Sequence, residues 1–148
     1  MEINGIAHVQ LTVSDFEACK KFYGPLLELF EMNVVFDDEE LKYWVGGRTA
    51  IAITRCDPAH AGERFVQRRV GLHHLCFRLR SREDVDRVHA LVVSLGAKVV
   101  YPPREGAWAP GYYSTLFEDP DGIRLEVNHV PGKGNLDPDI QIPKPRPR

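Results

Sequence analysis

Long apolar runs, an excess of charge of one sign and a secretory signal are all missing from this 148-residue sequence. No apolar stretch approaches the roughly 20 residues that a membrane-spanning helix needs. The 19 basic and 21 acidic residues give a net charge of −2, without the basic excess typical of nucleic-acid-binding proteins. The N-terminus has neither the basic start nor the apolar stretch of a signal peptide. We therefore expect a soluble, cytoplasmic protein whose partners include neither nucleic acid nor a membrane.

Cysteine is also scarce, with only Cys19, Cys56 and Cys76 in the chain. Their number is odd and none lies in a CxxC spacing, so we interpret them as free thiols in a reducing compartment. The 43% apolar and 27% charged residues are ordinary for a soluble globular protein. The length fits one compact domain, or two small units that share a core.

What the sequence does contain is a repeat. His8 heads a segment of alternating apolar residues at 8–13, and His74 heads another at 74–79, 66 positions later. Such alternation is typical of a strand with one buried face. Each segment runs into a serine followed three residues later by an acid, the pattern of a capping box at a helix start. These pairs are Ser14 with Glu17 and Ser81 with Asp84.

The repeat predicts an α+β protein made of tandem βαβββ modules, with a curved, cup-shaped mixed sheet and helices outside. The first module is expected at 1–56, with strands at 6–13, 33–36, 41–45 and 49–54 and a helix from Ser14 that Gly24-Pro25 interrupts. A linker follows at 57–70. The second module is expected at 71–130, with strands at 72–79, 98–101, 112–117 and 123–128 and a helix from Ser81 to Gly96. The proline-rich tail, 131–148, is predicted to be extended or disordered, and the whole forms one domain.

Two histidines and one carboxylate fall on the same side of these strands. His8 opposes the apolar residues of its strand, His74 does the same in the second module, and Glu126 opposes Leu125 and Val127 on the last strand. Imidazole and carboxylate groups that share one polar face suggest a metal site.

Three further motifs accompany these residues: the two His-headed strands, Phe22-Tyr23 with Leu26-Leu27, and Asp119-Pro120-Asp121-Gly122 ahead of Glu126. With them, residues 5–130 resemble the vicinal oxygen chelate superfamily, which includes glyoxalase I, extradiol dioxygenases and fosfomycin and bleomycin resistance proteins. The resemblance implies that one divalent metal ion, Fe, Ni, Mn, Co or Zn, is bound by His8, His74 and Glu126, with Glu126 also catalytic. The fourth family ligand position falls on Ala52, which cannot bind a metal. The resemblance also implies a small-molecule substrate and a homodimer.

Four further residues are candidates for a substrate pocket. Trp108 and Tyr113 belong to or adjoin the loop 104–111, whose composition suits a lid, although core or dimer packing is the plainer interpretation. Arg78 and Arg124 share the strand face of the candidate ligands and would suit a substrate carboxylate, with surface salt bridges as the alternative. His73 is expected to be structural or a partner of His74.

The family resemblance leaves three activities open. A metal-dependent lyase or isomerase, in which the metal stabilises an enediolate and a carboxylate acts as base, is favoured. An Fe(II) extradiol-type dioxygenase fits the three ligands, but the tyrosine that such enzymes carry ten residues before the glutamate is Leu116 here. Fosfomycin-modifying members also use a lysine and a serine at positions that become Gly106 and Pro110. The third alternative is a non-catalytic small-molecule or antibiotic-binding resistance protein.

Overall fold

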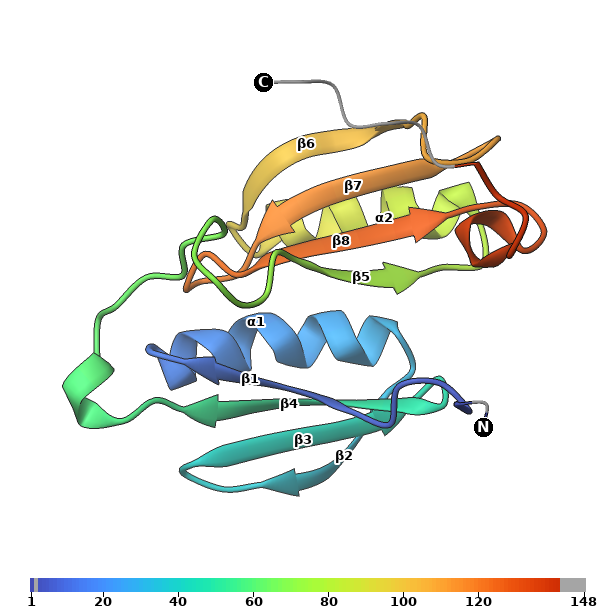
Figure 1. Cartoon of the computed structure of the whole chain (residues 1–148). Coiled ribbons are helices and arrows are strands. Elements are labelled where there is room, and N and C mark those ends of the chain that lie inside the picture. The colour runs from blue at the N-terminus through green and yellow to red at the C-terminus, as the bar shows by residue number, and fades with distance from the viewer. Residues whose placement is uncertain (2, 142–148) are drawn as a thin grey trace. The chain divides into compact units, whose positions relative to one another are not determined.

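The chain consists of two units with the same order of elements (Figure 1). The computed structural model describes residue 1 and residues 3–141. Unit 1 contains Met1–Val66 together with Asp119–Ile123, and unit 2 contains Gln67–Glu118 and the described residues from Arg124 onward. The elements of unit 1 are β1 (Val9–Val13), α1 (Phe16–Leu29), β2 (Asn33–Asp37), β3 (Leu41–Gly46), β4 (Thr49–Arg55) and the 3-10 turn η1 (Pro58–His60). Those of unit 2 are β5 (Leu75–Arg78), α2 (Arg82–Ser94), β6 (Lys98–Glu105), β7 (Tyr113–Glu118), β8 (Arg124–His129) and the 3-10 turn η2 (Gly134–Leu136).

The two sheets have identical topology. Their strand orders are β1-β4-β3-β2 and β5-β8-β7-β6, and in each the first strand runs parallel to the last while the other pairs are antiparallel. This confirms the prediction of an α+β fold built from tandem βαβββ modules. The bounds of the modules, linker and tail stay predictions, and residues 142–148 of the tail lie outside the described residues.

Helix α1 begins one residue later than the capping-box pattern indicates. Asp15 is its N-cap, because the Asp15 side chain accepts from the backbone N–H of Ala18 at 2.9 Å. Ser14 instead donates through both its backbone N–H and its hydroxyl to the carboxylate of Asp121. Pro25 lies inside the continuous helix rather than interrupting it. Leu26 and Leu27, which follow Pro25, are fully buried, and the free energy of that burial offsets the loss of the backbone hydrogen bond that proline removes.

Helix α2 follows the sequence pattern closely. The Ser81 hydroxyl accepts from the N–H of Asp84 at 3.1 Å, as the capping box predicts, and Gly96 takes a positive φ of 75° just beyond the helix. The buried side of α2 carries Val85, Val88 and Val92, and the helix contacts β6, β7 and β8. One face of the second sheet is thereby covered, which leaves the opposite face to carry the polar residues.

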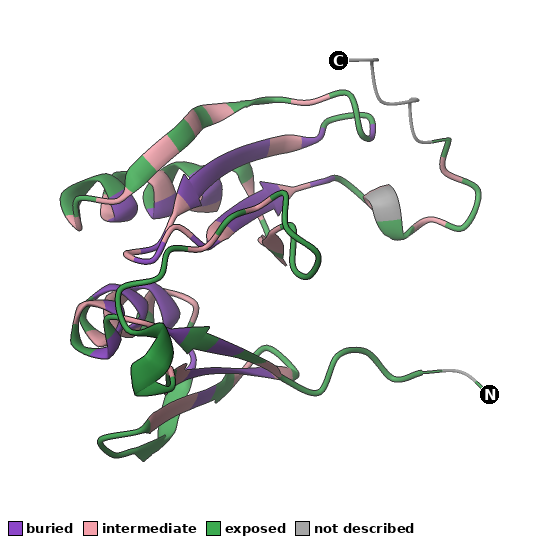
Figure 2. Cartoon of the chain, turned by 60° about the vertical axis from the view of Figure 1, so that its left-hand side comes forward, coloured by how far each residue is buried: buried purple, intermediate pink, exposed green. Residues whose placement is uncertain are grey.

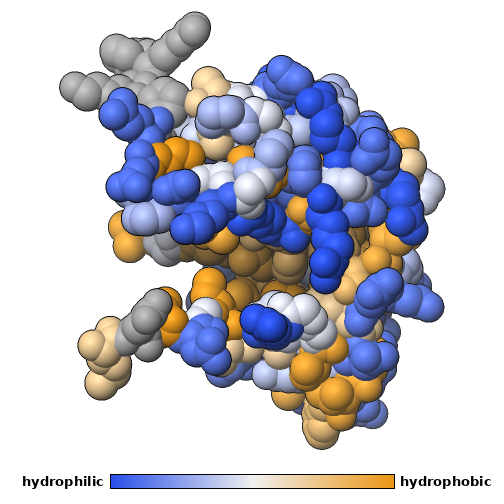
Figure 3. Space-filling view, turned by 90° about the vertical axis from the view of Figure 1, so that its right-hand side faces the viewer, coloured by the Kyte–Doolittle hydropathy of each residue, from blue (hydrophilic) through white to orange (hydrophobic). Residues whose placement is uncertain are grey.

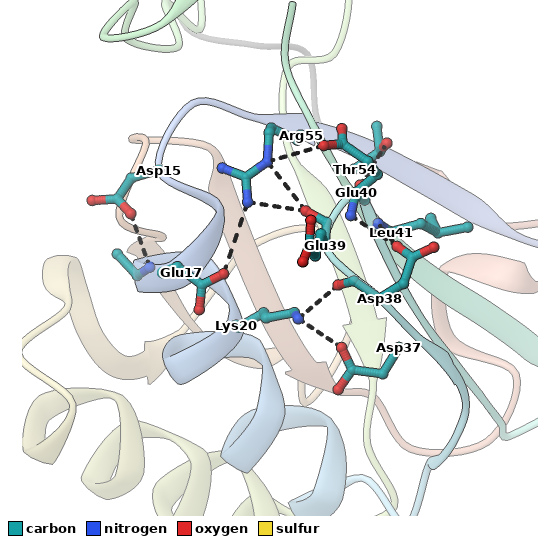
Figure 4. Close-up of polar contacts among 11 residues, drawn as sticks. Asp15, Glu17, Lys20, Asp37, Asp38, Glu39, Glu40, Leu41, Thr54 and Arg55 are labelled. Atoms are coloured by element: carbon teal, nitrogen blue, oxygen red, sulfur yellow. Dashed lines mark hydrogen bonds and ion pairs between the residues drawn. The ribbon is translucent and has the colours of Figure 1, made fainter.

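A charged cluster connects α1 to the hairpin of β2 and β3 in unit 1 (Figure 4). Asp37 forms ion pairs of 2.7 Å with both Lys20 and Lys42, and Lys20 also donates to the backbone carbonyl of Asp38. The hydrogen bonds from Lys20 and Lys42 to the Asp37 carboxylate lower its pKa. Asp37 is exposed and the two lysines are half-buried, so solvent screens the ion pairs and we assign the cluster a local structural role.

Strand β2 is exposed along its whole length, in contrast to the largely buried β8 (Figure 2). Its apolar side chains Val34, Val35 and Phe36 are each about half exposed. Apolar groups also lie among the hydrophilic ones on the surface in Figure 3. Neither α-helix of the described chain combines the length and apolar character that crossing a membrane requires.

Candidate functional site

Strands β5 and β8 bring two of the three predicted ligands together. Cys76 pairs directly with Glu126 in the parallel ladder, so His74, two residues earlier, lies on the same face of the sheet. The Nε2 atom of His74 is 3.3 Å from the Oε2 atom of Glu126. An imidazole nitrogen and a carboxylate oxygen therefore converge from adjacent strands.

The carboxylate of Glu126 is buried, with 6% of the residue exposed, and it is held in its ionised form. The Tyr112 hydroxyl donates to Oε1 at 2.5 Å. Burial alone would raise the pKa of Glu126, but hydrogen bonds from His74, Tyr112 and Ser114 outweigh burial and keep the pKa below its usual value. Tyr112 itself is buried, and burial raises the pKa of its phenol, so it stays a proton donor.

Unit 1 presents the equivalent positions with different side chains. Gln10 pairs with Ala52 just as Cys76 pairs with Glu126, which places Ala52 at the position that corresponds to Glu126. His8 directly precedes β1, is exposed, and has its ring centroid 6.5 Å from that of Tyr43. The predicted triad requires His8 to join His74 and Glu126, and this stays a prediction.

The residues of unit 2 suit a divalent metal in their chemistry. A histidine nitrogen and an ionised, buried carboxylate are ligands that Fe, Ni, Mn, Co and Zn accept. Asn128 lies two residues beyond Glu126 on the same face of the sheet. Its Oδ1 is one of two buried side-chain nitrogen or oxygen atoms that have no hydrogen-bond partner in the described chain. Within residues 1 and 3–141, however, no three or more His, Cys, Asp or Glu side chains gather closely enough to hold a metal alone.

The two candidate arginines are engaged within unit 2. Arg78 donates to the backbone carbonyls of Val130, Gly132 and Lys133 at 2.6–3.0 Å, so a substrate carboxylate would have to compete with that turn. Arg124 lies two residues before Glu126 on β8. It forms an ion pair of 3.3 Å with Glu118 and donates to the side-chain oxygen of Gln67. The proposed contact of either arginine with substrate stays a prediction.

The two aromatic candidates are not brought together. Trp108 is 47% exposed on the loop before β7. Tyr113 pairs with His129, and its register puts it on the opposite face of the sheet from Glu126. There its ring lies under the Arg82 guanidinium and its hydroxyl donates to Asp86 at 2.8 Å, both on α2. The structure therefore turns Tyr113 toward the helix.

Three residues around Glu126 and the His73-His74 pair were missed as site residues in the sequence. The predicted strand 112–117 placed Tyr112 at the parity of Ser114, but β7 begins at Tyr113, and Tyr112 reaches the carboxylate from the end of the preceding loop. Ser114 follows on β7 with the parity of Glu126, a signal that was available. Gln67 contacts His73, which in turn lies with its Nδ1 2.7 Å from Nδ1 of His74, as expected for a partner of that histidine.

Comparison with known proteins shows what this arrangement is similar to. A family model described as the glyoxalase/bleomycin resistance protein/dioxygenase superfamily matches residues 5–127. The uncharacterized protein YqjT of Bacillus subtilis strain 168 is 31% identical over 127 residues, covering 81% of this chain and 94% of YqjT. A glyoxylase/bleomycin resistance protein/dioxygenase domain from Frankia sp. EAN1pec is similar in fold, with 24% identity, a TM-score of 0.70 and coverage of 86% of this chain and 98% of that one. The fosfomycin resistance protein FosX of Mesorhizobium loti has 25% identity, a TM-score of 0.61 and coverage of 87% and 94%.

Proposed function

Because the chain belongs to the glyoxalase/bleomycin resistance protein/dioxygenase superfamily, we propose that it is a metal-dependent enzyme of the glyoxalase-like lyase or isomerase type. Its substrate would be a small organic molecule with oxygens that can chelate a metal. The observation that carries the proposal is the buried, ionised carboxylate of Glu126 beside the Nε2 atom of His74. Burying a carboxylate costs solvation free energy, and here hydrogen bonds from His74, Tyr112 and Ser114 offset that cost and keep the group anionic.

The proposed ligands are His74 and Glu126 of unit 2 with His8 of unit 1, and Ala52 leaves the fourth family position without a side-chain donor. When bound, a divalent metal would act as a Lewis acid toward the substrate oxygens. The low pKa of Glu126 keeps it available as an anionic ligand. The orphaned Oδ1 of Asn128 is positioned to accept a hydrogen bond from a ligand on the same face.

Glu126 is also the proposed base, and Tyr112 governs its strength. While the Tyr112 hydroxyl donates to Oε1, the carboxylate is a weak base, because every donor to the ionised form lowers its pKa. Release of that hydrogen bond would free a lone pair on Oε1 and raise the proton affinity of Glu126 toward the useful range for general-base catalysis. Tyr112 is thus proposed to adjust the base as the substrate enters.

An Fe(II) extradiol-type dioxygenase is the second candidate, and one observation favours it. The family tyrosine position is Leu116, which pairs directly with Glu126, yet a buried tyrosine hydroxyl still reaches Glu126 from Tyr112. Tyr101 adds another hydroxyl next to the site, 3.2 Å from Ser114 Oγ. An acid–base hydroxyl is therefore present without the expected residue.

A homodimer is proposed as the assembly. Strand β2 is the edge of its sheet and exposes three consecutive apolar residues, Val34, Val35 and Phe36. An exposed apolar edge strand favours pairing with another chain. A second copy of this chain is the partner that the family resemblance suggests.

Metal analysis of protein purified without oxygen tests the proposal. Wild-type protein is expected to hold stoichiometric Ni, Co, Zn or Mn, and both His74→Ala and Glu126→Gln should lose it, while the exposed His60→Ala variant should keep it. Oxidisable iron with oxygen uptake would favour the dioxygenase, and absence of bound metal would favour a non-catalytic small-molecule-binding protein. Full metal retention in His74→Ala would contradict the proposed ligand set.

A further inference from the structure

The segment that follows β8 folds back onto the loop that carries Tyr112. Residues 130–140, called the strap below, begin at the end of β8 and turn through η2. Ile140, the half-buried last residue of the strap, packs against the buried cluster formed by Ala109, Tyr112 and Val130. The strap therefore adds to the apolar cluster in which the Tyr112 ring lies.

Arg78, at the end of β5, fastens the strap at its start. Its guanidinium donates to the backbone carbonyls of Val130, Gly132 and Lys133 at 2.9, 2.6 and 3.0 Å. A guanidinium presents its N–H donors in a fixed fork, so one rigid group sets the positions of all these carbonyls. Backbone hydrogen bonds to the carbonyl three residues earlier continue the strap as far as Ile140. The position of Ile140 therefore depends on Arg78.

Tyr112 depends on such packing because it lies just outside the ladder of the second sheet. The pairing of β7 with β8 starts one residue later. Turn contacts hold the Tyr112 backbone, since its N–H donates to Ala109 at 3.1 Å and its carbonyl accepts from Gly106 at 2.9 Å. The loop also meets the strap at Gly111, where an added β-carbon would lie 2.9 Å from the Pro131 ring. The loop and the strap together therefore set the direction of the Tyr112 side chain.

We propose that Arg78 and Ile140 are positioning residues, which act through the strap to keep the Tyr112 hydroxyl on Glu126. The hydroxyl donates to Oε1 at 2.5 Å, and hydrogen bonds weaken steeply as their geometry departs from the ideal, so a small displacement of the ring weakens this one. The inference rests on the proposed function, in which release of that hydrogen bond strengthens Glu126 as a base. Opening of the strap is the movement that permits the release, and closure restores the hydrogen bond.

The strap suits such a movement because exposed groups fasten it. Arg78, which holds its start, is exposed, and Ile140 at its end is only half-buried. Leu136, between these two points, is 72% exposed. Segments with few buried apolar contacts and exposed hydrogen bonds open at a much lower free energy than the core. The strap can therefore open while β8, which carries Glu126, stays folded.

The test is the rate at which the Tyr112 hydroxyl proton exchanges with solvent in metal-free full-length protein. This rate is read by NMR from the deuterium isotope shift of the tyrosine Cζ signal, which Tyr112→Phe assigns. Ile140→Ala should speed the exchange roughly 4- to 12-fold, because about half the burial free energy of a fully buried isoleucine is lost. Ile140→Val should restore most of the wild-type rate. Leu136→Ala is the matched control within the strap and should exchange at the wild-type rate.

The hydroxyl of Tyr23 is the internal reference for these rates. It is buried in unit 1, where it donates to Asp119 at 2.7 Å. General destabilisation would speed exchange at Tyr23 and Tyr112 together, whereas loss of positioning speeds it at Tyr112 alone. Arg78→Gln should reproduce the pattern of Ile140→Ala. Equal acceleration at both tyrosines, or an unchanged Tyr112 rate in Ile140→Ala, overturns the inference.

Zn²⁺ titration of the same proteins separates this inference from the proposed function. If the Tyr112 rate responds as expected but wild type binds no Zn²⁺, the role of the strap stands and the proposed metal-dependent function fails. If Zn²⁺ binds through His74 and Glu126 but the Tyr112 rate does not respond, the proposed function stands and the role of the strap fails.

Discussion

Tyr112→Phe is the change that most directly tests how Glu126 is held. It removes the hydroxyl that donates to Oε1 at 2.5 Å while keeping the ring, which packs with Ala109 and Val130. A hydrogen bond to a charged group contributes about 1.5–3 kcal/mol, and here the acceptor is buried. For a domain of this size that loss lowers Tm by roughly 3–12 °C. The matched control is Tyr113→Phe, whose hydroxyl donates to the exposed Asp86, and its effect should stay within about 0.5 kcal/mol.

The pH dependence of the stability difference between wild type and Tyr112→Phe identifies the Glu126 carboxylate as its cause. Because the pKa of Glu126 is lower in the native state than its ordinary value of 4.5, the ionised form contributes stability above that value. That contribution is lost as the pH falls through the lowered native pKa, and with it the charge assistance to the Tyr112 hydrogen bond. The free energy of urea unfolding, measured in the presence of a chelator, should therefore be much larger for wild type than for Tyr112→Phe at pH 7.5. This difference should become smaller at acidic pH. A difference that is absent at pH 7.5, or equal at both pH values, would refute the reasoning.

Three further results are expected. Burial raises the pKa of Asp119 to about 6, so the free energy of unfolding of wild type should rise as the pH falls from 7.5 to 5. Urea unfolding of Asp119→Asn should show no such rise, and a wild type that loses stability over this range would contradict the assignment. Light scattering at micromolar concentration should give a dimer mass for wild type and a monomer mass for Val35→Asp, whereas a monomeric wild type removes the dimer. Ala52→Glu should destabilise the metal-free protein, tighten metal binding and weaken bidentate inhibitors; unchanged affinities would mean that Ala52 does not face the metal.

Local patterns predicted the secondary structure well because each element satisfies its own periodicity. The second helix has Ser81 as its N-cap, as the capping box indicates, because the Ser81 hydroxyl accepts from the N–H of Asp84. The first helix differs because Asp121, 107 positions away, takes the hydrogen bonds of Ser14, and Asp15 serves as the cap instead. No local rule contains that long-range contact.

Prediction of the helix interruption at Pro25 failed for an energetic reason. A proline inside a helix costs about 3 kcal/mol, but Leu26 and Leu27 behind it are fully buried and each contributes about 1.5–3 kcal/mol. Tertiary burial therefore outweighs the local penalty. For Tyr112, the predicted strand gave the face of the sheet, but only the folded loop shows that its hydroxyl reaches Glu126.

The difference between Glu126 and Ala52 follows from the donors that each unit places around that position. In unit 2, Ser114 and Asn128 pair across β7 and β8 beside Glu126, and Ser114 helps to hold the carboxylate ionised. The corresponding pair in unit 1 is Leu41 with Thr54, so the serine is replaced by an apolar side chain. Ala52 is fully buried in that setting, and a carboxylate there would lose its hydration without equivalent hydrogen bonds. The two modules thus share topology and register, but only unit 2 surrounds this position with donors that stabilise a carboxylate.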